Sequence, residues 1–271
     1  MKQKYRILVL DLDGTLTNSK KEITPRTLQA LIDLQARGVK LVLASGRPTY
    51  GIAPLAEQLE MKRYGGFILS YNGGEIINWA TGELMYKNLL PDSVLPALYE
   101  AAQQDGHTIL SYEDEYIVTE KPYNEYVDKE VFLNKMKLKL VKNFLEEIRR
   151  PLPKCLIVGH AEQLARTEAR LQRELEGVIS VYRSEPFFLE LVPLGIDKAR
   201  SLSVLLEELG MTREEMVAMG DGFNDQSMIE FAGMGVAMAN AQEPVKQAAD
   251  YVTLSNDEDG VADAIEKLFC E

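Results

Sequence analysis

The sequence predicts an α/β fold in which a doubly wound parallel sheet is interrupted by an inserted segment of α+β character. Short apolar runs alternate with segments of helical period over residues 1–80, and this alternation returns after about residue 192. Between them, apolar residues recur at every second position, which is typical of antiparallel strands. Because the two flanks share one pattern, we expect 1–83 and 192–271 to form one core domain, with 84–191 inserted into it.

The beginning of the chain predicts strands that alternate with helices. The apolar run 7–10 predicts a buried strand, and 24–38 predicts a helix that begins at a Thr-Pro pair and ends at a glycine. Runs at 39–44 and 67–69 predict two further strands, with a turn at 71–74 after the second of them. This order is that of a βαβαβ unit.

The end of the chain extends the same sheet. Leucines recur at helical spacing over 202–209, and a glycine follows them. We expect strands at 216–219, 235–238 and 251–253, helices that begin near 224 and 244, and an amphipathic helix over 261–269.

The middle of the chain predicts a separate sheet. Alternating apolar residues indicate strands, and one segment has helical period. We expect antiparallel strands at 108–112, 116–119, 155–158 and 187–192, and a helix over 163–175.

The composition excludes several classes of function. With 42 acidic and 30 basic residues, the net charge of -12 has the wrong sign for a nucleic-acid binder or for attachment to an anionic membrane. Two cysteines, Cys155 and Cys270, and two histidines provide no disulfide framework or zinc cluster, so a metal would need oxygen ligands. No apolar run has the length of a membrane span or of a signal-peptide core. We expect a cytoplasmic protein.

Two carboxylates follow the first predicted strand in the segment Asp11-Leu12-Asp13-Gly14-Thr15. Open α/β sheets bind ligands at the carboxyl ends of their strands. Carboxylates this close repel each other unless a cation or a proton intervenes. A solvated turn with helix-capping aspartates is the alternative for this pair alone.

A second acidic cluster, which contains Asp221, Asn224 and Asp225, follows the predicted strand at 216–219. Since the ends of parallel strands lie along one edge, these groups are expected to face the first pair. The spacing does not fit an EF-hand, whereas Mg²⁺ with retained waters and a substrate phosphate fits such a carboxylate site.

Positive potential can come from two further segments. Ser45 and Gly46 follow the second strand and precede Arg47, so a hydroxyl and backbone N–H groups can meet an anion there. Lys198 begins the predicted helix near 202–209 and can contact a phosphate as a point charge. Taken singly, Ser45-Gly46 is more simply interpreted as an ordinary turn, and Lys198 as a solvent-facing lysine in the first turn of a helix.

In this order along a doubly wound pattern, the four motifs resemble those of the haloacid dehalogenase superfamily. The motifs are Asp11-x-Asp13-Gly-Thr, Ser45-Gly46, Lys198 and Gly-Asp221-x-x-Asn-Asp225. The inserted segment is similar to the cap of the Cof-type subfamily and its YidA-like sugar phosphatases. The resemblance implies a Rossmann-like core with a substrate-specificity cap, and Mg²⁺-dependent hydrolysis of small phosphate monoesters, foremost sugar phosphates.

The resemblance also implies residue roles. Asp11 would be the nucleophile that forms an aspartyl-phosphate, and Asp13 the general acid and then base. Mg²⁺ would be held by the carboxylates of Asp11 and Asp221 and by the backbone carbonyl of Asp13. Asp225 would fix the ligands and Lys198, while Arg47 would bind substrate or brace the core, with bracing favoured. The phosphate would be met by Leu12 and Gly46 through their backbone N–H groups, and by Ser45, Lys198 and Asn224.

A charge count leads to one further expectation. The four aspartates, Mg²⁺ and Lys198 together carry a charge of -1, which would repel a phosphate dianion. Protonating Asp13 brings the count to zero. The count therefore predicts that Asp13 is protonated in the reactive complex.

Several alternatives remain open from the sequence. A phosphomutase or phosphotransferase would pass the phosphoryl group to a sugar hydroxyl, and a non-catalytic sugar-phosphate sensor would only bind it. A structural Mg²⁺ domain would leave Ser45 and Lys198 unexplained.

The partner expected is a small phosphorylated metabolite, bound by a monomer or small homo-oligomer. Candidates for contacts to the leaving group are Tyr116, Lys121, Tyr123, Tyr126 and the turn 183–188, for which a solvated sheet face is the plainer alternative.

Overall fold

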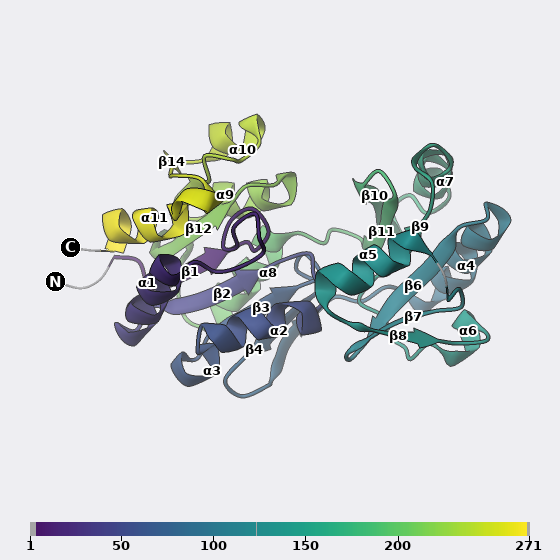
Figure 1. Ribbon diagram of the computed structural model, residues 1–271, viewed down its shortest axis with the longest axis horizontal. Helices are drawn as coiled ribbons and strands as arrows, with labels where there is room; N and C mark the ends of the chain where they lie inside the picture. The colour runs from purple at the N-terminus through teal and green to yellow at the C-terminus, as the bar shows by residue number, and fades with distance from the viewer. Residues whose placement is uncertain (1–3, 123, 270–271) are drawn as a thin grey trace. The chain divides into compact units, whose positions relative to one another are not determined.

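The computed structural model describes residues 4–122 and 124–269, which divide into two compact units (Figure 1). Unit 1 contains the chain through Tyr86 and again from Asp197 onward, and unit 2 is Lys87–Ile196. Purple and yellow, the two ends of the colour scale, both lie in unit 1, so one unit is inserted into the other.

Unit 1 is built on an eight-stranded sheet in the order β14-β13-β12-β1-β2-β3-β4-β5. The strands from β14 to β3 pair in parallel, and β4 returns antiparallel to β3. The bounds are β1 Ile7–Leu10, β2 Lys40–Ala44, β3 Phe67–Ser70, β4 Glu75–Asn78, β5 Leu84–Lys87, β12 Met216–Gly220, β13 Met234–Ala237 and β14 Tyr251–Val252.

Helices cover both faces of this sheet. Leu8 and Leu10 of β1 belong to one buried apolar cluster, and Ile7 and Val9 belong to another, because neighbouring side chains of a strand point to opposite faces. The first cluster includes side chains of α1, α2, α10 and α11, and the second includes those of α8 and α9. This confirms the predicted doubly wound α/β class. The bounds are α1 Pro25–Ala36, α2 Thr49–Gln58, α3 Met61–Tyr64, α8 Lys198–Glu208, α9 Gln226–Phe231, α10 Glu243–Ala248 and α11 Gly260–Phe269.

Local sequence explains how α1 begins and ends. Thr24 precedes the helix in an extended conformation, and its side chain accepts a hydrogen bond from the Thr27 N–H. Pro25 occupies the first helical position, where its missing N–H costs nothing. Gly38 adopts φ +91° just beyond the end, a conformation that a glycine reaches without strain.

Unit 2 has a six-stranded sheet in the order β10-β11-β9-β6-β7-β8. Side chains of α4, α6 and α7 pack with one face of this sheet in an apolar core of its own. The bounds are β6 Thr108–Glu113, β7 Tyr116–Thr119, β8 Lys137–Leu140, β9 Cys155–Val158, β10 Ile179–Glu185, β11 Phe188–Pro193, α4 Leu95–Gln104, α5 Glu125–Asn134, α6 Phe144–Glu147 and α7 Ala161–Glu174.

The structure differs from the sequence expectation in two places. β7 and β8 pair in parallel, because α5 lies between them in the chain and acts as a crossover, so the sheet of unit 2 is not wholly antiparallel. β5 is the last strand of the unit 1 sheet, although the expected boundary at 83/84 assigns its residues to the insertion.

Cys155 is buried with a free thiol in β9, and Cys270 lies outside the described residues. Among residues 4–122 and 124–269, no helix combines the length and apolarity required to cross a membrane.

Candidate active site

Three adjacent strands of unit 1 end beside one another and carry the predicted acidic and polar motifs. β1 lies between β2 and β12 in the parallel sheet, with Leu10 level with Leu43 and Met219. Asp11, Ser45 and Asp221 follow these strands directly. The chain thus brings together at one sheet edge groups that are far apart in the sequence.

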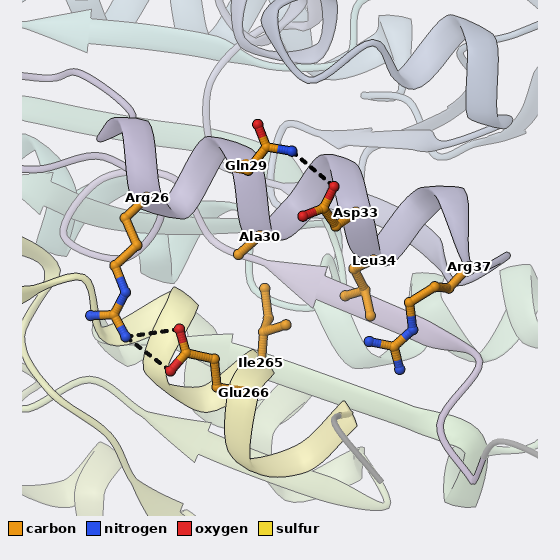
Figure 2. Close-up of a pocket in the computed structure, with 8 residues that line it drawn as sticks. All are labelled: Arg26, Gln29, Ala30, Asp33, Leu34, Arg37, Ile265 and Glu266. Atoms are coloured by element: carbon orange, nitrogen blue, oxygen red, sulfur yellow. Dashed lines mark hydrogen bonds and ion pairs between the residues drawn. The ribbon is translucent and has the colours of Figure 1, made fainter.

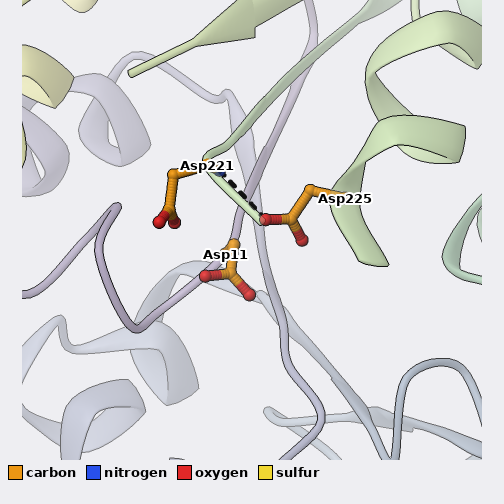
Figure 3. A group of neighbouring side chains, drawn as sticks. All are labelled: Asp11, Asp221 and Asp225. Carbon is orange, nitrogen blue, oxygen red and sulfur yellow. Dashed lines mark hydrogen bonds between the residues drawn. The ribbon is translucent and has the colours of Figure 1, made fainter. Parts of the chain in front are cut away.

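Three carboxylates form the centre of this edge, as Figure 3 shows. Asp11, Asp221 and Asp225 each offer an oxygen, and these oxygens all lie within 4.8 Å of one another. Burial and the neighbouring Asp225 charge raise the pKa of Asp11 to about 8, and burial is also the main cause that raises the pKa of Asp221 to about 6. Such a buried set of oxygen donors suits a hard divalent cation.

Lys198 supplies a buried positive charge beside the cluster. Its residue is 1% exposed, and its ammonium donates hydrogen bonds to Asp11 Oδ1 at 2.7 Å, Asp225 Oδ1 at 2.6 Å and the Ala44 carbonyl at 2.8 Å. Burial alone would lower the pKa of Lys198, but the two carboxylates outweigh this effect and raise it. Lys198 therefore stays charged and partly neutralises Asp11 and Asp225.

Asp225 shapes the loop after β12. Its Oδ2 accepts hydrogen bonds from the backbone N–H groups of Asp221 at 3.0 Å and Gly222 at 2.9 Å. A Cβ at Gly220 would lie 2.4 Å from the Asp225 Cβ, so only glycine permits this close approach. Both carboxylate oxygens of Asp225 are thus engaged by the protein, which suits a positioning role better than metal ligation.

Gly14 and Thr15 position Asp221. The Thr15 hydroxyl donates a hydrogen bond to Asp221 Oδ1 at 2.9 Å. Gly14 has φ +86°, and a Cβ there would lie 2.3 Å from Asp221 Oδ2. The Gly-Thr pair after Asp13 thus makes room for the second acidic segment and holds it.

Asp13 is not one of the three clustered carboxylates and is held by two cations. Arg47 donates from Nε to Oδ2 at 2.7 Å and from Nη2 to Oδ1 at 2.6 Å, and the Lys21 ammonium lies 2.7 Å from Oδ1. Burial would raise the pKa of Asp13, but hydrogen bonds and charge from Arg47 and Lys21 lower it. Bidentate pairing of this kind fixes both the charge and the orientation of a carboxylate.

These two cations alter the charge count made from the sequence. That count includes Lys198 but neither Arg47 nor Lys21, whose addition changes the total with Mg²⁺ from -1 to +1 while Asp13 is ionised. With these cations included, the count no longer requires a protonated Asp13 for phosphate binding, and the protonation of Asp13 in the reactive complex stays a prediction.

Asn72, which sequence reasoning missed, forms hydrogen bonds with the loops that carry Ser45 and Asn224. Its backbone N–H donates to the Ser45 carbonyl at 2.9 Å, and its side-chain Oδ1 accepts from Asn224 Nδ2 at 3.0 Å. A Cβ at Gly46 would lie 3.1 Å from the Asn72 amide nitrogen. Asn72 has φ +56°, which asparagine tolerates better than most residues, and the turn signal at 71–74 was the available clue.

Three predicted phosphate-binding residues, Leu12, Ser45 and Asn224, lie on the loops that follow β1, β2 and β12. The Ser45 hydroxyl accepts a hydrogen bond from the Arg47 N–H at 3.2 Å, and the Leu12 side chain is fully buried. Asn224 lies in a short 3₁₀ turn, Phe223–Asp225, where the sequence predicts the start of an α-helix, and α9 begins only after this turn.

The candidate side chains of unit 2 make contacts within that unit. The Tyr126 hydroxyl lies 3.1 Å from His160 Nδ1 and its ring stacks on Phe187, while the Lys121 ammonium donates to the His107 carbonyl at 2.7 Å. Tyr116 packs against the apolar core of unit 2, and Tyr123 lies outside the described residues. Their contact with a leaving group stays a prediction.

A surface pocket of about 480 Å³ between α1 and α11 carries no comparable chemistry. Figure 2 shows Arg26 bonded to Glu266 across the pocket and Gln29 bonded to Asp33 along α1. The pocket is lined by residues of these two helices and by Arg37, and contains none of the predicted site residues.

Comparisons with known proteins agree with this arrangement. Residues 8–265 match the family model of the haloacid dehalogenase-like hydrolases. Phosphatase YwpJ of Bacillus subtilis is 30% identical over 97% of this chain and 99% of its own length. The 5-amino-6-(5-phospho-D-ribitylamino)uracil phosphatase YcsE of the same organism is 30% identical over 96% of this chain and 94% of its own.

A solved structure extends the match to three dimensions. A haloacid dehalogenase-like hydrolase from Bacteroides thetaiotaomicron superimposes with a TM-score of 0.96 and 64% identity, over 98% of this chain and 100% of that chain. The family match covers both flanks of the insertion and all four motifs. The chain therefore belongs to the haloacid dehalogenase-like hydrolase family and is an enzyme of its phosphatase type.

Proposed function

We propose that the protein is a Mg²⁺-dependent phosphatase that hydrolyses small phosphate monoesters, foremost sugar phosphates, through an aspartyl-phosphate on Asp11. One observation carries the proposal: Asp11 lies within a buried carboxylate cluster and against Lys198, while Asp13, two residues later, is held separately by Arg47. The two nearby carboxylates thus have different environments. Without a bound cation the pKa of Asp11 is raised and that of Asp13 is lowered, so the assigned roles require that a cation bound at the cluster lowers the pKa of Asp11 and that Asp13 takes up a proton before it acts as an acid.

In the first step, a carboxylate oxygen of Asp11 attacks phosphorus while the bond from phosphorus to the ester oxygen breaks. Asp13, after taking up a proton, gives it to the departing ester oxygen, because a sugar alkoxide is a poor leaving group. A positioned acid of this kind typically accelerates a reaction by about 10² to 10⁴.

In the second step, Asp13 takes a proton from water, and the hydroxide oxygen forms a bond to phosphorus as the bond to Asp11 breaks. Inorganic phosphate leaves, and Asp13 is again protonated. The covalent intermediate divides one difficult displacement between two easier ones.

The metal would be held by Asp11, Asp221 and the backbone carbonyl of Asp13. When bound, Mg²⁺ would neutralise charge on the transferring phosphoryl group. Asp225 and Arg47 act through other residues in this proposal: Asp225 positions Lys198 and the loop of Asp221, and Arg47 orients Asp13.

Lys198, Ser45 and Asn224 meet the phosphate oxygens through their side chains, and Leu12 and Gly46 meet them through backbone N–H groups. The hydrogen bonds of Asn72 to Ser45 and Asn224 support this assignment, because they hold two of the phosphate-binding loops together. Fixed donors of this kind need no rearrangement as charge develops.

The substrate class is supported by a relative. YcsE is named for a substrate whose phosphate is carried by a ribityl chain, which is a polyol.

The inserted unit is proposed as the substrate-specificity cap. The free, buried thiol of Cys155 is compatible with a cytoplasmic protein, and we propose that it acts as a monomer or small homo-oligomer.

The test is release of inorganic phosphate from sugar phosphates, nucleotides, pyridoxal phosphate and p-nitrophenyl phosphate, with Mg²⁺ or EDTA. Wild type and Asp11→Asn are compared side by side. We expect release that needs both Mg²⁺ and Asp11. Isomerised sugar phosphate without free phosphate would support a mutase instead, and binding of esters without any turnover would support a sensor.

A further inference from the structure

Lys21 is a second cation on Asp13, and the two side chains are exposed. The Lys21 ammonium lies 2.7 Å from Asp13 Oδ1, and the side chains of Lys21 and Asp13 are 52% and 38% exposed. Neither the motifs nor the roles described above include this lysine. An exposed cation in direct contact with the proposed acid is therefore available to whatever approaches that acid.

Arg47 already donates a hydrogen bond to each carboxylate oxygen of Asp13, so Asp13 keeps its partners when Lys21 moves away. Arg47 binds both carboxylate oxygens and its side chain is 16% exposed, whereas Lys21 binds only Oδ1, an atom that it shares with Arg47. An exposed ion pair is worth little, because water screens it and long side chains lose entropy in forming it. Lys21 can leave Asp13 at small cost, and Arg47 still holds the carboxylate.

The turn that carries Lys21 is fixed by hydrogen bonds. Lys21 has φ +63°, and its N–H donates to the Asn18 carbonyl at 2.9 Å, while the Asn18 N–H donates to the Glu22 carbonyl at 3.0 Å. Ser19 binds both carboxylate oxygens of Asp257 through its N–H and hydroxyl. The ammonium is thus presented from a defined position rather than from a loose loop.

We propose that Lys21 binds a carboxylate on the leaving group, so that the preferred esters are phosphorylated small hydroxy acids, including sugar acids. This inference rests on the proposed function, in which Asp13 contacts the ester oxygen. Lys21 then lies within two hydrogen-bond lengths of that oxygen, which a carboxylate two carbons from the esterified carbon can reach. The Asp13 carboxylate that Lys21 now binds is an internal stand-in for such a group.

The test uses two esters that differ only at the carbon two positions from the phosphorylated one. This carbon is a hydroxymethyl group in glycerol 3-phosphate and a carboxylate in 3-phosphoglycerate. The kcat/KM ratio of 3-phosphoglycerate to glycerol 3-phosphate is measured for wild type, Lys21→Met, Lys21→Arg and Lys20→Met. Lys20 is the matched control, because it is an exposed lysine on the same turn whose backbone N–H donates to Asn18 Oδ1.

We expect Lys21→Met to lower this ratio by about tenfold or more, mainly through KM for 3-phosphoglycerate, as loss of one charge-assisted hydrogen bond predicts. Lys21→Arg should keep most of the ratio, and Lys20→Met should leave it unchanged. A ratio that is the same in Lys21→Met and wild type would overturn this inference alone. Absence of Asp11-dependent phosphate release from every ester, p-nitrophenyl phosphate included, would overturn the proposed function together with it.

Discussion

Arg47 donates two hydrogen bonds to the carboxylate of Asp13, from Nε to Oδ2 at 2.7 Å and from Nη2 to Oδ1 at 2.6 Å. The pair joins the loop after β2 to the loop after β1, and it fixes the plane of the Asp13 carboxylate. Sequence reasoning left Arg47 between substrate binding and bracing, and this contact favours bracing of a particular group, the proposed acid.

Replacing Arg47 by lysine should lower kcat for sugar phosphates by about tenfold, because an ammonium cannot reproduce a two-point contact. Positive charge is kept, so affinity for the phosphate group should change little. Steady-state kinetics with a sugar phosphate, and inhibition by inorganic phosphate, separate the two effects. An unchanged kcat would show that the orientation of Asp13 does not limit turnover.

Asp13→Asn should keep phosphate binding while kcat falls by about 10² to 10⁴, the usual size of a general acid–base contribution. The loss should be larger for a sugar phosphate than for p-nitrophenyl phosphate, since p-nitrophenolate leaves without a proton. Measuring kcat for both esters, with the inhibition constant of inorganic phosphate, tests this. Equal loss of binding and turnover would contradict the assigned role.

Lys198→Met should destabilise the metal-free protein by about 3–5 kcal/mol, because it leaves two buried carboxylates without their counter-charge. Urea unfolding of wild type and variant measures this change. Added Mg²⁺ should restore part of the loss by supplying positive charge beside Asp11. Lys267→Met is the control, since it breaks an exposed pair with Asp263 and should leave unfolding nearly unchanged.

Mg²⁺ should raise the melting temperature of the wild type, and EDTA should reverse the rise, because a ligand that binds only the folded state stabilises it. Asp221→Asn removes a carboxylate from the cluster and should reduce this shift. Asp92→Asn, at an exposed aspartate of unit 2, should keep the full shift. Thermal unfolding at increasing Mg²⁺ concentration is the measurement, and an equal shift in Asp221→Asn would remove this residue from the metal site.

His107 should make unit 2 sensitive to acid. Burial lowers the pKa of His107 below its usual 6.5, and Nε2 pairs with the Thr167 hydroxyl at 3.0 Å. The unfolded chain therefore binds the proton more readily than the folded one. The stabilisation that neutral His107 gives to the folded state is complete above pH 6.5, and it is lost as the pH falls from 6.5 through the lower folded-state pKa. The stability difference between pH 7.5 and 5.5 should be smaller in His107→Gln, measured by urea unfolding at both values.

The α/β class followed from the sequence because strand and helix periods alternate in both flanks. Strands such as β1 are apolar runs with both faces buried, and α1 has a capping residue, a proline and a terminal glycine in the expected places. The parallel pairing of β7 with β8 did not follow. It depends on α5, whose apolar stripe is weak because Glu130 and Asn134 are buried on it beside Tyr112.

The acidic and phosphate-binding motifs were visible because they follow strands directly. Asn72 was visible only as part of a turn, since its contacts with Ser45 and Asn224 join three loops that are distant in sequence. Lys21 gave no signal, because a lysine in a polar turn is ordinary until the fold places it against Asp13. Pairings between loops depend on the tertiary structure and not on local pattern.

The insertion of unit 2 has a consequence for synthesis on the ribosome. Unit 2 is one continuous stretch, Lys87–Ile196, whereas β1 in unit 1 must pair with β12, whose Met216 lies level with Ile7. When unit 2 has emerged and begins to fold, β1 can already pair with β2 on one side but still lacks β12 on the other. The nascent chain therefore carries an open, apolar strand edge until the last quarter of the polypeptide appears, and that interval is when a chaperone has most to protect.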